Sequence, residues 1–114
     1  MGNNKIQKIN RYLLRIEYDG TSFHGWQKQK DCKTVQGEIE LAFYKLVGTN
    51  VNVIGAGRTD TGVHAFYQIA HVDLEKDWIP AKLEGALNFF LKKIPISILA
   101  VSYTHLRAHE TPCH

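Results

Sequence analysis

The residues best suited to chemistry lie near the middle of the chain, in the glycine-rich run at residues 55–65. Arg58 precedes Asp60 by two positions, and side chains two apart in an extended segment project to the same side. A guanidinium so placed would keep the Asp60 carboxylate ionised and could also bind a phosphate. An ionised carboxylate in a partly dry site can act as a general base, a nucleophile or a metal ligand. The run is therefore a candidate catalytic site.

Simpler interpretations of the same run remain open. Asp60-Thr61-Gly62 suits a turn in which the carboxylate caps its own backbone. His64 could position a substrate, or it could be a structural or surface residue beside a strand. His24 and His71 are interpreted as structural or surface residues. A metal site is disfavoured, because no second carboxylate lies near Asp60 in the sequence.

A second candidate segment is the aperiodic loop that follows Asp19-Gly20-Thr21. It places two aromatic residues among amide and basic residues, a mixture suited to stacking on bases and touching phosphates. The candidate RNA contacts are Phe23, Trp26, Gln27 and Lys28. The alternative is that both aromatic side chains fold back and cover the core, since large aromatics are seldom left exposed.

Hydrophobic periodicity predicts the elements that must position these residues. Four segments have strand patterns: residues 11–18, 51–54, 66–72 and 96–101. A helix with Thr34 as its N-cap is predicted to end at about Val47, with Gly48 as its stop and with Glu38, Glu40 and Lys45 facing solvent. Pro80 suits the first turn of a second helix, which Lys92 and Lys93 would close.

The resulting order is β-α-β-β-α-β, which predicts an α+β, ferredoxin-like sandwich. Two helices would cover one face of a four-stranded antiparallel sheet, and the other face would be left for a partner, a second subdomain or RNA. Residues 11–101 form the predicted domain, after a flexible lead-in at residues 1–10. Residues 102–114 fit no pattern and are interpreted as a disordered or foreign tail.

Composition limits the remaining choices. The net charge of +3 weakly favours a polyanionic partner. No apolar run is long enough for a signal peptide or a membrane span. Cys32 and Cys113 lie far apart and are interpreted as free thiols. We therefore expect a soluble, cytoplasmic protein.

Four motifs in order give the chain a resemblance to a known family. They are Tyr18-Asp19-Gly20-Thr21-Ser22-Phe23-His24-Gly25-Trp26-Gln27, Thr34-Val35-Gln36-Gly37, Gly55-Ala56-Gly57-Arg58-Thr59-Asp60 and Gly62-Val63-His64-Ala65. The chain resembles, over roughly residues 11–100, the amino-terminal part of the tRNA pseudouridine synthase A (TruA) family.

The resemblance implies an isomerase that acts on uridines in the anticodon stem-loop of tRNA. The reaction breaks the N-glycosidic bond, turns the base and rejoins it through C5, with no metal or organic cofactor. Asp60 would be the required catalytic carboxylate, and Arg58 would pair with it and help to hold the flipped nucleotide. Further substrate contacts are expected from Thr59, Thr61, Gly62 and His64.

The chain also departs from that family. Its members are longer, with a second similar subdomain that completes the cleft, and they usually act as homodimers. We therefore expect this chain to have little or no activity alone. Two other function classes are possible: a non-catalytic RNA-binding module and a phosphate-binding enzyme. The sequence gives little support to a phosphate-binding enzyme, because the glycine run lacks the P-loop pattern and precedes a strand.

Overall fold

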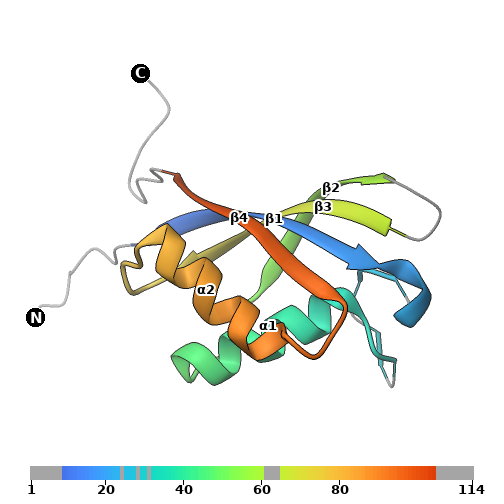
Figure 1. The fold of residues 1–114 in the computed structure, drawn as a ribbon. Helices are drawn as coiled ribbons and strands as arrows, with labels where there is room; N and C mark the ends of the chain where they lie inside the picture. Colours follow the sequence, from blue (N-terminus) through green and yellow to red (C-terminus); the bar gives the residue numbers. More distant parts are fainter. Residues whose placement is uncertain (1–8, 24, 28, 31, 61–64, 105–114) are drawn as a thin grey trace, which may run out of the picture.

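The computed structural model describes residues 9–104 except residues 24, 28, 31 and 61–64, and for residues 58–60 it describes the backbone. Its four strands form one antiparallel sheet in the order β2-β3-β1-β4. Their bounds are Asn10–Asp19 for β1, Val53–Asp60 for β2, Ala65–Leu74 for β3 and Ile96–Thr104 for β4. Helices α1 (Val35–Val47) and α2 (Pro80–Leu91) lie against the same face (Figure 1). The predicted ferredoxin-like βαββαβ fold is confirmed.

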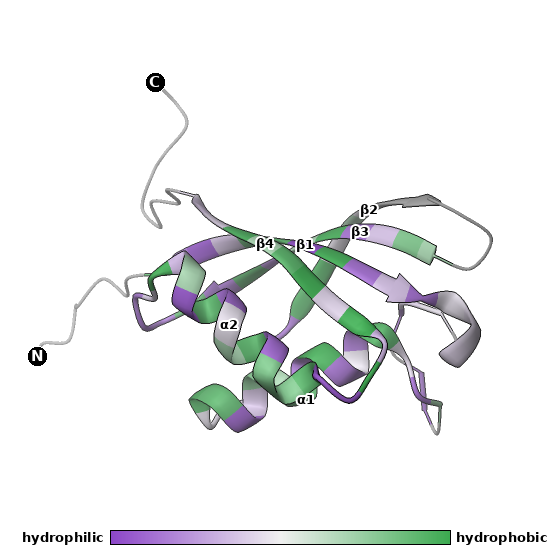
Figure 2. Cartoon of the chain, in the orientation of Figure 1, coloured by the Kyte–Doolittle hydropathy of each residue, from purple (hydrophilic) through white to green (hydrophobic). Residues whose placement is uncertain are grey.

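The core lies between the sheet and the two helices. Alternation along β1 decides which residues enter it, because successive side chains of a strand point to opposite faces. Tyr12, Leu14 and Ile16 are fully buried, whereas Leu13 is exposed on the uncovered face. Hydrophobic stretches broken by hydrophilic residues run along both helices and the strands (Figure 2). No helix in the described part of the chain is long and apolar enough to cross a membrane.

Helix α1 begins and ends as predicted. Thr34 Oγ1 accepts a hydrogen bond from the Gly37 amide at 3.3 Å. Gly48 adopts the left-handed conformation with φ 84°, and its amide donates to Tyr44 O at 2.9 Å. One detail of the prediction is wrong: Glu40 does not simply face solvent, because its Oε2 accepts from the Val53 amide at 2.9 Å. Glu40 thereby ties α1 to the start of β2.

Helix α2 is held mainly by burial. Pro80 occupies its first turn, and its N-cap residue, Ile79, makes no side-chain capping bond. Leu83, Leu87 and Leu91 form its buried stripe at helical spacing. The helix ends at Leu91.

All four strands are longer than predicted, and the extensions of β2 and β4 are the ones that change an interpretation. β2 was expected at residues 51–54 but runs from Val53 to Asp60, and β4 continues past residue 101 to Thr104. The extension of β4 is stabilised at its end, since the Tyr103 hydroxyl donates to Asn10 Oδ1 and the Thr104 hydroxyl donates to the Arg11 carbonyl, both at 3.2 Å. Residues 102–104 therefore belong to the sheet and not to a tail. Residues 1–8 and 105–114 lie outside the described residues.

Candidate active site

The glycine-rich run forms the second half of an edge strand. β2 pairs with β3, and the register shifts between Gly55 and Gly57, so that Ala56 is an extra residue without a partner. Beyond this bulge Arg58 lies opposite Gln68, Thr59 opposite Tyr67 and Asp60 opposite Phe66. The strand was predicted to end at residue 54, but the backbone stays extended and paired up to Asp60.

The structure meets the backbone condition for the proposed pairing of Arg58 and Asp60, since both lie in an extended strand two positions apart. Their side chains, with that of Thr59, lie outside what the structure describes, as do Thr61, Gly62 and His64 altogether. The roles assigned to these residues stay predictions, and so does the alternative of a turn from Asp60 to Gly62.

The candidate RNA-contacting loop is anchored to the start of α1. The Val35 amide donates to Gly25 O at 3.1 Å, and the Gln36 amide donates to Trp26 O at 2.9 Å. Phe23 is only 8% exposed and belongs to the core, which favours the alternative that it covers the core. Trp26 is half-buried against the core, Gln27 is exposed, and Lys28 lies outside the described residues.

Trp26 lies directly beside the bulge. A shallow hollow of about 590 Å³ separates the loop from β2 and is lined by Trp26, Gln27, Gln36, Ile54, Gly55, Gly57 and Gln68. Its lining includes two glycines, one indole and three carboxamides. Such a surface offers one stacking ring and several donors and acceptors within reach of the strand that carries Asp60.

Two polar residues near the site were not singled out from the sequence. Gln68 is 5% exposed in the middle of β3, and its Nε2 donates to Gly57 O at 2.9 Å and to Ile69 O at 3.0 Å. The Tyr18 hydroxyl is buried and has no hydrogen-bond partner among the described residues. The Tyr18 ring contacts Phe66, the residue opposite Asp60, at 5.6 Å between centroids. A lone glutamine in an apolar strand was the available signal for Gln68.

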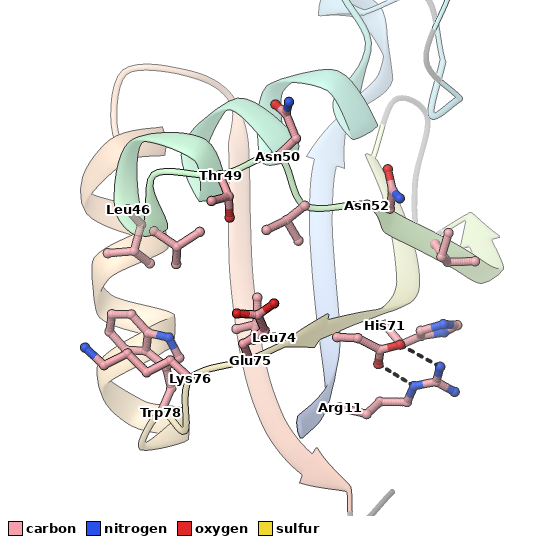
Figure 3. A pocket seen from close by; sticks show the side chains of 14 residues that line it. Arg11, Leu46, Thr49, Asn50, Asn52, His71, Leu74, Glu75, Lys76 and Trp78 are labelled. Carbon is pink, nitrogen blue, oxygen red and sulfur yellow. Dashed lines mark hydrogen bonds and ion pairs between the residues drawn. The ribbon is translucent and has the colours of Figure 1, made fainter. Parts of the chain in front are cut away.

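A separate pocket of about 700 Å³ lies at the opposite end of the β2–β3 pair. There Arg11 forms two hydrogen bonds with Asp73, at 2.7 and 2.9 Å, and Asn50 and Asn52 lie across from them (Figure 3). The Arg11 guanidinium lowers the pKa of the Asp73 carboxyl, chiefly through this hydrogen bond, while partial burial opposes the shift. His71, interpreted from the sequence as a structural or surface residue, lines this pocket.

Neither region gathers ligands for a metal ion within the described ranges, where no three His, Cys, Asp or Glu side chains come together. The described side chains beside the glycine run offer three carboxamides and one indole.

Comparison with known proteins places the same segments in one family. A sequence model described as tRNA pseudouridine synthase matches residues 15–106. The tRNA pseudouridine synthase A of Jannaschia sp. (strain CCS1) is 50% identical over 95 residues, which cover 83% of this chain and 36% of the relative. The tRNA pseudouridine synthase A of Roseobacter denitrificans is 48% identical over 101 residues, which cover 89% of this chain and 39% of the relative. The tRNA pseudouridine synthase A of Methylobacterium radiotolerans is 52% identical over 90 residues, which cover 79% of this chain and 36% of the relative. The chain thus spans little more than a third of the length of these relatives.

Proposed function

This chain belongs to the tRNA pseudouridine synthase family, and from that premise we propose that it carries the catalytic carboxylate of a tRNA-uridine isomerase, Asp60. The observation that supports the proposal best is the run from Arg58 to Asp60, held as extended strand at the end of β2 beside the Trp26 hollow. The relatives are named as tRNA pseudouridine synthases, and the match to the family covers this run.

The proposed reaction is an isomerisation that balances within one nucleotide. The bond between uracil N1 and the ribose C1′ breaks, a bond between C5 and C1′ forms, and the hydrogen on C5 is replaced by one on N1. Nothing is oxidised or reduced, so the site requires no redox cofactor. Asp60 supplies the carboxylate, and Arg58 keeps it ionised and binds a phosphate of the extruded nucleotide.

The uridine must leave its stack before the carboxylate can reach it. Extrusion costs a few kcal/mol and is easiest in a loop or a weak stem, which favours the anticodon stem-loop of tRNA as the substrate. We assign Thr59, Thr61, Gly62 and His64 to the extruded nucleotide. Trp26, Gln27 and Lys28 are assigned to the flanking RNA, because one stacking ring and polar or basic side chains suit unpaired bases and their phosphates. Phe23 supports that loop from the core.

The matched segment spans little more than a third of the relatives, so we expect other parts of a synthase to complete the cleft and the homodimer. The test therefore uses a completed enzyme, in which residues 1–104 of this chain are joined to the part of the Roseobacter denitrificans relative that follows its matched segment. The completed enzyme should form pseudouridine in tRNA transcripts. The 114-residue chain alone should form little or none.

Asp60→Asn in the completed enzyme is expected to lower kcat by at least about 1,000-fold, as removal of an essential catalytic group does. Binding of tRNA should change by less than about threefold, since the variant keeps the size of the side chain. Asp73→Asn is the matched control, a carboxylate lost at the far end of β3. Retained turnover in Asp60→Asn would refute the catalytic assignment. Turnover by the 114-residue chain that Asp60→Asn abolishes would instead show that the chain needs no completion.

A second function, a non-catalytic RNA-binding module, is favoured by one feature of the uncovered sheet face. There Tyr67 is 37% exposed and lines a small hollow of about 290 Å³ with Arg15 and Leu99. An exposed aromatic beside a guanidinium can stack on an unpaired base. This alternative predicts that tRNA binding depends on salt and on Tyr67, is indifferent to Asp60, and brings no pseudouridine formation even in the completed enzyme.

A further inference from the structure

Trp26 approaches the backbone of Gly55 more closely than any larger residue at position 55 would allow. A Cβ added to Gly55 would lie 2.6 Å from Trp26 Nε1 and 3.0 Å from Gln68 Nε2. Glycine is therefore required there for close approach. The same addition at Gly57, two positions along the strand, would meet nothing within 4 Å. The two glycines have different roles despite their shared run.

Gln68 binds the strand on the other side of the bulge. A bulge disrupts the ladder locally and leaves backbone groups in need of partners. The Gln68 amide donates to Gly57 O, the first carbonyl after the extra residue, and also to its neighbour Ile69 O. Gln68 is 5% exposed, and its two hydrogen bonds are partly buried, so competition from water is reduced.

The position of Trp26 is itself set by α1. The amide of Gln36 donates to Trp26 O, and the side-chain amide of Gln36 donates to Val53 O at 2.8 Å. One residue in the first turn of α1 thus joins the Trp26 loop to the start of β2. The indole consequently faces Gly55 from a support that is tied to the same strand.

The bulge determines which residues of β3 lie opposite positions 58 and 60. Continued without a bulge from the pair of Gly55 and Ala70, the strand would set position 58 opposite Tyr67 and position 60 opposite Ala65. With Ala56 as the extra residue, position 58 lies opposite Gln68 and position 60 opposite Phe66. A shift of one residue exchanges the two faces of a strand.

The β3 partners in the observed register and in the slipped register lie on different faces of the sheet. Gln68 is buried and Phe66 packs against the core, both on the face that the helices cover. Tyr67 is exposed on the uncovered face. A slipped strand would therefore give positions 58 and 60 a different environment, even if the rest of the sheet stayed intact.

We propose that Trp26, Gly55 and Gln68 form a clamp that fixes the bulge at Ala56 and so positions Arg58 and Asp60 for catalysis. The three are positioning residues, and their role does not require contact with the tRNA. The consequence for catalysis rests on the proposed function, whereas the control of register does not.

The register arm of the test uses the 114-residue chain and NMR contacts between β2 and β3. The wild-type chain should show cross-strand contacts between residues 58 and 68 and between 60 and 66. Gly55→Ala should lose these contacts or shift them by one residue, while the β1–β3 contacts persist. Gly57→Ala, the matched control, should keep them. Trp26→Leu alone, which removes the ring from the clamp, should weaken the same contacts.

Gln68→Leu keeps the test decisive if Gly55→Ala does not fold. It introduces no clash, removes the amide donor, and should weaken the contacts of residues 57–60 selectively. The clamp is refuted if a folded Gly55→Ala chain and the Gln68→Leu chain both keep the pairing of 58 with 68. It is also refuted if Gly57→Ala loses that pairing as readily as Gly55→Ala.

The catalytic arm uses the completed enzyme and normalises rates to the folded fraction. Gly55→Ala is expected to lower kcat about 100-fold, the size of effect that a displacement of about 1 Å can cause. KM for tRNA should change by less than about threefold, and Gly57→Ala, the matched control, should keep the wild-type rate. Equal losses in kcat and in RNA affinity for Gly55→Ala would refute the positioning role. If the completed wild-type enzyme is inactive, the proposed function fails, while the register arm still decides the clamp.

Discussion

The two edge strands of the sheet, β2 and β4, each contain one extra residue, but the two bulges are held differently. In β4 the extra residue is Leu99, since Ile16 pairs with Ile98 and Arg15 with Ala100. Asn88 of α2 binds both backbone groups of Ile98: its Oδ1 accepts from the amide at 2.8 Å, and its Nδ2 donates to the carbonyl at 3.0 Å. The β4 bulge is thus fixed by one side chain from a packed helix.

The β2 bulge depends on groups that come from three places in the chain. Gln68 of β3 contributes a donor to one carbonyl, Trp26 contributes a ring from a loop, and Gly55 contributes the space for that ring. The two bulges therefore differ in how they are held: one side chain holds the β4 bulge, whereas three groups far apart in the sequence hold the β2 bulge. The bulge in β2 is the one that precedes Asp60.

The largest effect on stability is expected at the β4 bulge, because one side chain, Asn88, binds both backbone groups of Ile98. Asn88→Ala leaves the amide and the carbonyl of Ile98 without partners, and Ile98 is 2% exposed. We expect the free energy of unfolding to fall by about 3 kcal/mol in urea titrations followed by circular dichroism. Asn52→Ala, an exposed asparagine, should change it by less than about 0.5 kcal/mol. A loss below about 1 kcal/mol for Asn88→Ala would remove the distinction between the two bulges.

A smaller effect is expected at the β2 bulge. Gly55→Ala should lower the free energy of unfolding by about 2 kcal/mol, because the added methyl group displaces Trp26 or Gln68. Gly57→Ala should be neutral to within about 0.5 kcal/mol, since its methyl group meets nothing and its backbone does not need φ above zero. The same urea titrations measure both. Equal losses for the two variants would show that the strand tolerates neither, and would contradict the specific contact at Gly55.

The smallest effect concerns a cross-strand contact that holds no bulge, the ion pair of Arg11 and Asp73. Its side chains are 34% and 38% exposed, so solvent screens the interaction and it should contribute less than about 1 kcal/mol. Arg11 lowers the pKa of Asp73 in the folded state. The contribution is therefore present above the carboxyl's pKa in the unfolded chain and is lost as pH falls through the lower pKa of the folded state.

Arg11→Met tests that sign. The difference in unfolding free energy between the wild-type chain and Arg11→Met should be largest near pH 7. It should shrink as the pH falls below the ordinary range of a carboxyl pKa and Asp73 becomes protonated. Added salt should shrink it as well. A difference that grows on acidification would contradict the ion pair as its source.

The sequence predicted the elements that are defined by local patterns. Thr34 and Gly48 marked the ends of α1, and the alternation of Tyr12, Leu14 and Ile16 identified the buried face of β1. Pro80 marked the start of α2. These signals act within a few residues of each other, through capping bonds and side-chain periodicity, so a single sequence contains them.

The candidate site was predicted only in part. Spacing and motif resemblance singled out Asp60 and Arg58, but the strand was predicted to end at residue 54, because glycines carry no hydrophobic alternation and have low strand propensity. The strand forms there because β3 offers a paired edge, and because Trp26 and Gln68 contact the glycines from elsewhere in the chain. Phe23 was left undecided between core and RNA, and its 8% exposure follows from packing that no local pattern encodes.

By itself the sequence determined the βαββαβ order, the caps of α1 and the family to which the chain belongs, since each rests on neighbouring residues or on motifs in order. Only the tertiary structure decided the register of β2. The extra residue at Ala56 depends on contacts between Trp26, Gly55 and Gln68, which lie far apart in the chain. Register is a property of paired strands, and a single residue of slip exchanges their faces. Packing therefore determined which residues of β3 lie opposite positions 58 and 60.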